Sequence, residues 1–157
     1  PSPNVFSYDQ QPEMSSADIT KVIVSNIKYS VYDFIAVNYA NADMVGHTGN
    51  LKATITAVEF LDKCLRQVIE KILESGGMAI VTADHGNADE MIDLKTGEEM
   101  TMHSKNPVPF IIAKNGYSPE KYKLRNNGIL GNVAPTLLDV LEIEKPKEMI
   151  LGSLIEK

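Results

Sequence analysis

The chain contains no tryptophan and only one cysteine, Cys64, so no disulfide can form within it. A single cysteine fits a reducing compartment, and we expect a cytoplasmic protein. No apolar run approaches the roughly 20 residues that span a membrane, and the first residues lack a signal-peptide pattern. Basic residues are outnumbered 15 to 21 by acidic ones, for a net charge of −6. Because phosphate backbones attract basic surfaces, we expect neither nucleic-acid nor membrane partners.

Apolar residues, by contrast, make up 43% of the 157 residues. This fraction is enough for one folded domain with a core and excludes a disordered tail. The chain starts at Pro1 and not at a methionine. We therefore expect it to be either processed or a piece of a longer protein.

Local patterns predict alternating helices and strands. Apolar residues at helical spacing predict helices, and short continuous apolar runs predict strands buried on both faces. The alternation predicts an α/β fold, in which a mainly parallel sheet carries helices on both faces. The expected helices span residues 15–27, 51–74 and 133–141, the expected strands 32–37, 78–81 and 107–112, and a hairpin is expected around residues 95–97.

One stretch, residues 38–50, is the point around which the chain is organised. It follows the first predicted strand and precedes the longest predicted helix, so it is expected to be a loop at the place where α/β proteins bind ligands. It contains Asp43 and His47, while Gly46 and Gly49 free the backbone. A carboxylate and an imidazole on one short loop can converge on a single cation.

The only three histidines each follow a predicted strand or the hairpin. Because the carboxyl ends of parallel strands lie at one edge of a sheet, these side chains are expected to meet in space. Candidate metal ligands are Asp43, His47, Asp84, His85 and His103. Such mixed ligation suits Mn²⁺ or Zn²⁺, and five ligands favour two metal ions of the kind that catalyses phosphoryl transfer. The alternative is that the two aspartates simply accept hydrogen bonds from turn N–H groups.

Three sequence blocks resemble the cofactor-independent phosphoglycerate mutases of the alkaline phosphatase superfamily, and they occur in the family's order. Weaker similarities lie at residues 11–15, 133–138 and 146–154, so the resemblance covers the chain from end to end. The three blocks are Asn41-Ala-Asp-Met-Val-Gly-His-Thr-Gly49, Thr82-Ala-Asp-His-Gly-Asn-Ala-Asp89 and His103-Ser-Lys-Asn-Pro-Val-Pro-Phe110.

The resemblance implies that residues 1–157 are the C-terminal portion of a metal-binding, alkaline-phosphatase-like domain, and hence a partial domain. It implies two manganese ions, one held by Asp43, His47 and His103 and the other by Asp84 and His85. The parent enzyme would be an isomerase of glycolysis that interconverts 3-phosphoglycerate and 2-phosphoglycerate through a phosphoserine intermediate.

The resemblance also implies that several functional groups are absent from this chain. The family's nucleophilic serine, its remaining metal ligand, its catalytic lysine and its substrate-clamping residues belong to an N-terminal part. We expect Ser104 and Thr48 to be capping groups and not nucleophiles, and the isolated chain to be inactive. The alternatives are another phosphomutase or phosphatase of the superfamily, or a non-catalytic metal-binding fragment.

Overall fold

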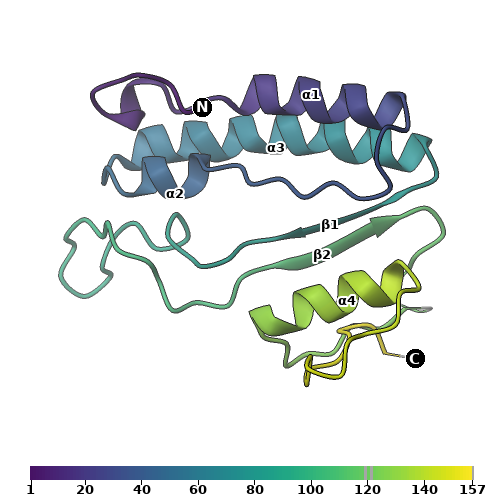
Figure 1. Cartoon of the computed structure of the whole chain (residues 1–157). Coiled ribbons are helices and arrows are strands. Elements are labelled where there is room, and N and C mark those ends of the chain that lie inside the picture. The colour runs from purple at the N-terminus through teal and green to yellow at the C-terminus, as the bar shows by residue number, and fades with distance from the viewer. Residues whose placement is uncertain (119, 121, 157) are drawn as a thin grey trace. The chain divides into compact units, whose positions relative to one another are not determined.

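The computed structural model describes residues 1–118, 120 and 122–156, which fall into two compact units, Pro1–Asn115 and Gly116–Lys157. The two units are described separately below. Figure 1 shows the elements in chain order. They are η1 (Tyr8–Gln10), α1 (Ser16–Lys28), α2 (Asn41–Gly46), α3 (Leu51–Glu74), β1 (Met78–Thr82), β2 (Phe110–Lys114), η2 (Leu130–Asn132) and α4 (Val133–Val140).

Helix α3 is the longest element of the first unit, and the sequence marks both of its ends. The side chain of Asn50 accepts a hydrogen bond from the backbone N–H of Ala53 at 3.1 Å, which caps the first turn. At the other end, Gly76 adopts a left-handed backbone with φ +75°. The N–H of Gly77 then donates to the carbonyl of Ile72 at 2.9 Å, as in a Schellman motif. The predicted helix is confirmed.

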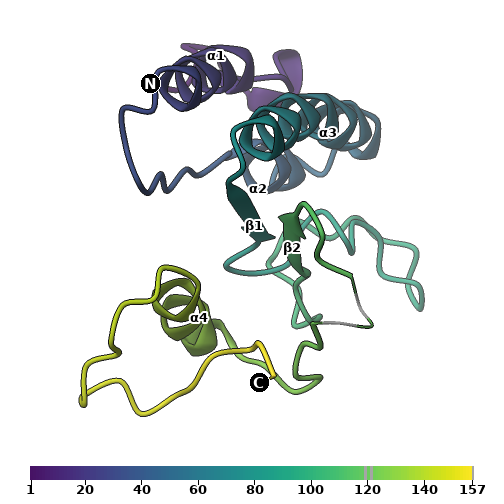
Figure 2. The same cartoon turned by 90° about the vertical axis from the view of Figure 1, so that its right-hand side faces the viewer.

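The core of the first unit lies where α3 packs against α1 and α2. Figures 1 and 2 show α1 and α2 along α3, with the strands beyond it. Small residues of α3 face these contacts, and Ala57 is fully buried. Cys64, on the same helix, is also buried. Small side chains allow the helix backbones to approach one another closely, and this brings α2 against the first turns of α3.

Strands β1 and β2 pair in an antiparallel sheet, with Ile80 opposite Ile112 and Thr82 opposite Phe110. The predicted α/β class is confirmed, but the pairing of these two strands is antiparallel where a parallel pair was expected. The physical reason is the connection, residues 83–109. It is an irregular excursion that turns back beside β1, whereas a parallel pair requires a crossover that returns to the starting edge.

Residues 32–37, predicted to be a buried strand, form no strand in the structure. They run as an extended segment in which the side chains of Tyr32, Phe34 and Val37 are exposed. The prediction of a buried strand is therefore wrong: the segment has the apolar composition of a strand, but a strand also needs a neighbouring backbone to receive its hydrogen bonds. None of the described residues pairs with this segment as a strand.

The stretch expected to be a loop, residues 38–50, instead contains helix α2. The buried side chain of Asn41 stands at its first position and holds it in place. Its amide donates to the carbonyls of Pro12 and Glu13, both at 2.8 Å, and its Oδ1 accepts from the hydroxyl of Ser16. Tertiary hydrogen bonds thus fix a helix too short to be stable alone.

The second unit contains η2, α4 and the chain's last described residues. Thr136 is buried in α4, where its hydroxyl donates to the carbonyl of Asn132 and accepts from the N–H of Leu154. Leu124 pairs with Ile155 in an isolated antiparallel bridge. The predicted helix near residues 133–141 is confirmed, with Pro135 in its first turn.

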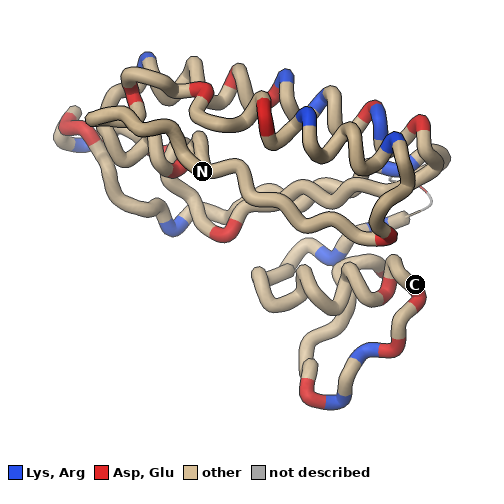
Figure 3. The backbone as a smooth tube through the Cα atoms, turned by 45° about the horizontal axis from the view of Figure 1, so that its top comes forward, with Lys and Arg blue, Asp and Glu red and all other residues tan. Residues whose placement is uncertain are grey.

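No helix in the described part of the chain is long and apolar enough to cross a membrane. Figure 3 shows acidic and basic positions interspersed along the helices.

Candidate metal centre

Helix α2 brings the first two candidate ligands together. Asp43 lies in its first turn and His47 is its C-cap residue, so the two stand one helical turn apart on the same face. Oδ1 of Asp43 lies 3.1 Å from Nε2 of His47. The convergence expected of a flexible loop is therefore produced by helical geometry.

The ring of His47 is oriented by a backbone group. Its Nδ1 lies 2.6 Å from the carbonyl oxygen of Thr101. Because a carbonyl can only accept, Nδ1 must carry the proton and donate it. In the neutral ring this leaves the lone pair of Nε2 free and directed at Asp43. A histidine held in this way is prepared to bind a cation through Nε2.

His103 completes a compact group of three. Its Nε2 lies 3.1 Å from Nε2 of His47 and 3.3 Å from Oδ1 of Asp43. Donor atoms about 2.1 Å from one cation, at tetrahedral or octahedral angles, lie about 3.0–3.4 Å apart. The three separations in the structure fall in this range. Two imidazoles and one carboxylate are also a donor set that Mn²⁺, Co²⁺ and Zn²⁺ accept.

Three buried polar side-chain atoms at this place have no hydrogen-bond partner among the described residues. Two belong to candidate ligands, Oδ1 of Asp43 and Nδ1 of His85, and the third is Oδ1 of the neighbouring Asn87. A buried polar atom without a partner is costly, so its presence calls for a compensating group. A cation bound by the Asp43 and His85 atoms would supply it for both. The residues present therefore fit a divalent metal ion.

His85 lies between the two aspartates. Its Nδ1 is 3.9 Å from Oδ1 of Asp43, and its Nε2 is 3.7 Å from Oδ1 of Asp84. The carboxylate of Asp84 is 85% exposed. The His85 ring stacks on His103 with centroids 3.7 Å apart. Ligand atoms of Asp43, His85 and His103 all lie within 4.8 Å of one another. His85 was predicted to bind the second metal ion together with Asp84. In the structure it also lies near Asp43 and His103, which were predicted to bind the first.

His85 and His103 meet for a reason other than the one predicted. They were expected at the carboxyl ends of parallel strands. In the structure, His85 follows β1 and His103 precedes β2, and antiparallel pairing puts the end of β1 beside the start of β2. An isolated bridge between Gly86 and Ser104 continues this pairing into the excursion. All five predicted residues nevertheless lie at one end of the sheet.

Some groups at the centre were not identified from the sequence. The carbonyl of Thr101 leaves no sequence signal, because every residue has one. Asn87 is almost fully buried with its Nδ2 3.5 Å from Nδ1 of His47. Of the two nearby hydroxyls, Thr48 donates to the carbonyl of Val45 and Ser104 to Asp89, as expected of capping groups.

The chain is similar to known proteins over its whole length. A model of the Metalloenzyme superfamily matches residues 1–145. The chain therefore belongs to the Metalloenzyme superfamily, which agrees with the donor set at the centre.

The individual relatives are more specific. The 2,3-bisphosphoglycerate-independent phosphoglycerate mutase of Clostridioides difficile strain 630 is 50% identical over 157 residues, which is 100% of this chain and 30% of that protein. The second enzyme of this name in Methanosarcina barkeri is also 50% identical, over 100% of this chain and 29% of its own length. The chain thus spans about a third of these relatives.

A solved structure gives the same result. The phosphoglycerate mutase of Leishmania mexicana, determined at low cobalt concentration, superposes with a TM-score of 0.87 and 37% identity. The match covers 99% of this chain and 30% of that one. The two chains are therefore similar in sequence as well as in fold.

Proposed function

We propose that this chain is the metal-binding portion of a phosphoglycerate mutase, an isomerase of glycolysis that interconverts 3-phosphoglycerate and 2-phosphoglycerate. The observation that carries the proposal is the convergence of Asp43, His47 and His103, whose ligand atoms are 3.1–3.3 Å apart. It occurs in a chain half-identical along its entire length to named mutases. The remaining groups of the reaction would come from the rest of a longer protein, and the compartment would be the cytoplasm.

The proposed division of labour within the chain follows from its contacts. Asp43, His47 and His103 would hold one divalent ion, and Asp84 and His85 would contribute to a second. Manganese is the proposed metal. Bound divalent ions would supply the positive charge that stabilises the oxygens of a phosphoryl group in transfer. The Thr101 carbonyl selects the tautomer of the neutral His47 ring in which Nε2 carries the lone pair, so Nε2 is the nitrogen available as a ligand.

The first test is the number of bound metal ions. The purified chain is loaded with Mn²⁺, the excess is removed, and the metal per chain is measured. About one ion would support an independent first site, and about two would mean that Asp84 and His85 suffice with water. A chain that is folded by circular dichroism but binds no Mn²⁺ would contradict the proposed self-contained first site.

The second test concerns the reaction. This chain would replace the matching segment of the Clostridioides difficile mutase, and the chimera would be assayed with 3-phosphoglycerate and with a pentose phosphate. We expect mutase activity with phosphoglycerate only, and its loss when the chimera carries His47→Ala. Turnover of the pentose phosphate in place of phosphoglycerate would instead support a different phosphomutase. A folded chimera without activity toward either substrate would contradict the proposal.

A further inference from the structure

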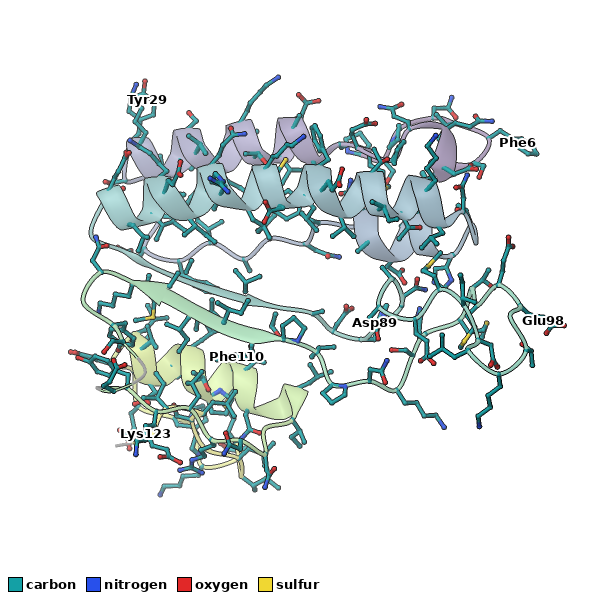
Figure 4. The ribbon with its side chains drawn as sticks, turned by 180° about the vertical axis from the view of Figure 1, so that it is seen from behind. Phe6, Tyr29, Asp89, Glu98, Phe110 and Lys123 are labelled. Atoms are coloured by element: carbon teal, nitrogen blue, oxygen red, sulfur yellow. The ribbon has the colours of Figure 1, made fainter. Side chains whose placement is uncertain are left out.

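The carboxylate of Asp89 joins the two segments that carry His85 and His103. Its Oδ2 accepts a hydrogen bond from the hydroxyl of Ser104 at 2.8 Å and another from the amide of Asn106 at 2.7 Å. Ser104 directly follows His103, and Asp89 lies four residues after His85. We call Asp89, Ser104 and Asn106 the Asp89 clamp. Figure 4 shows Asp89 on the irregular excursion beyond the strands.

The backbone beneath the Asp89 clamp is closely paired. The N–H of Ser104 donates to the carbonyl of Gly86 at 2.9 Å. A Cβ on Gly86 would lie 2.2 Å from the Ser104 hydroxyl and 2.6 Å from Oδ1 of Asp89. The clamp therefore occupies the space that a larger residue beside His85 would need. This close approach ties the segment after β1 to the segment before β2.

The two histidine rings lie directly beside this connection. The rings of His85 and His103 stack with centroids 3.7 Å apart and an interplanar angle of 14°. Each histidine is adjacent in sequence to one residue of the Gly86–Ser104 bridge: Gly86 follows His85, and Ser104 follows His103. The hydrogen bond from Asn106 holds the pKa of Asp89 below its usual value. At neutral pH the carboxylate is therefore ionised and can only accept.

We propose that Asp89 is a positioning residue, which holds His103 against His85 through Ser104 and Asn106 and thereby raises the affinity of the centre for divalent metal. The expected effect on metal affinity rests on the proposed function, whereas the expected effect on the contact between the two rings does not. Oδ2 of Asp89 accepts both hydrogen bonds of the clamp, so Asp89 acts on the two histidines through Ser104 and Asn106.

The matched control is Asp93, another carboxylate of the same excursion. Its Oδ1 accepts from the backbone N–H groups of Lys95 and Thr96, and so stabilises a turn. Asp89→Ala removes the clamp, Asp89→Asn keeps its shape with one acceptor oxygen, and Asp93→Ala removes a comparable local structure. Circular dichroism checks that each variant is folded.

The first measurement uses the metal-free chain and follows the nuclear Overhauser effect between ring protons of His85 and His103. The second is the affinity for Mn²⁺ by titration calorimetry. For Asp89→Ala we expect loss of the ring contact and about 10- to 100-fold weaker Mn²⁺ binding, the range typical of residues that orient metal ligands. Asp89→Asn should be intermediate, and Asp93→Ala should change neither.

The ring contact decides the positioning role whether or not metal binds. A folded Asp89→Ala chain that keeps the contact would overturn the proposal, and so would equal losses in Asp93→Ala. Loss of the contact with unchanged Mn²⁺ affinity would also overturn it. If the unmodified chain binds no Mn²⁺, the metal assignment fails, whereas the ring contact still tests the role of Asp89.

Discussion

Asn87 occupies the space that a side chain on Gly46 would need, since a Cβ on Gly46 would lie 1.9 Å from Oδ1 of Asn87. Gly46 ends helix α2, which carries Asp43 and precedes His47, and Asn87 follows His85 by two residues. The contact therefore joins the two segments that supply most of the candidate ligands. It requires glycine because of close approach and not because of backbone conformation.

Replacing Gly46→Ala should destabilise the first unit by about 1–3 kcal/mol, the usual cost of inserting atoms into a filled space. Urea unfolding followed by circular dichroism measures this loss. Asn87→Ala empties the space, so the double variant should lose less stability than the sum of the two single variants. Strict additivity would show that the two residues are not in contact.

His47→Ala should weaken Mn²⁺ binding more than Asp89→Ala does, because it removes a proposed ligand together with the hydrogen bond of that ligand to Thr101. We expect a loss beyond about 100-fold, measured by titration calorimetry. Asp62→Ala, at an exposed position of α3, is the control and should leave the affinity unchanged. Unchanged binding in His47→Ala would show that the assignment of His47 is wrong.

Asn41→Ala should lower the free energy of unfolding by about 2–3 kcal/mol. Asn41 is 1% exposed, and its loss leaves the Ser16 hydroxyl and the Pro12 carbonyl without the partner that Asn41 supplies, whereas the Glu13 carbonyl keeps the N–H of Ser16. Asn26→Ala is the control, because the Asn26 amide donates one exposed hydrogen bond to the carbonyl of Val22. That variant should change stability by less than about 0.5 kcal/mol. Equal effects in urea unfolding would contradict the role assigned to Asn41.

The chain alone should self-associate through the extended segment of residues 32–37. Its apolar side chains are exposed, and the sheet of the first unit has open edges. Sedimentation velocity should show association that rises with concentration and falls in Phe34→Asp. Phe6→Asp is the control, since Phe6 is exposed alone at the N-terminal end of the unit (Figure 4). A compact monomer at every concentration would contradict this expectation.

The sequence predicted the elements whose hydrogen bonds are local. Helix α3 was predicted from its apolar spacing and from the glycines that end it, and α1 and α4 were predicted within a few residues. Helical hydrogen bonds join residues four apart, so the neighbouring sequence contains most of the information. The short helix α2 was missed because Asn41 anchors it to residues 12–16, a contact that no local pattern reveals.

The five candidate ligands were proposed from the sequence, because only certain residue types bind divalent metal, and their assignment stays a prediction. Their arrangement could not be read from the sequence. Whether His85 meets His103 depends on the direction in which β1 and β2 pair, and strand pairing joins residues distant in sequence. The extended segment 32–37 shows the same limit, since its apolar pattern is that of a strand but none of the described residues pairs with it.

By itself, then, the sequence determined the three longer helices, the α/β class, the resemblance to metal-dependent mutases and the residue types of the centre. Only the tertiary structure decided that Asp43 and His47 share a helical turn, that Thr101 orients His47, and that Asp89 joins the segments of His85 and His103. The physical reason is that side-chain chemistry is a property of each residue, whereas the distances between ligands depend on which backbone segments pack together.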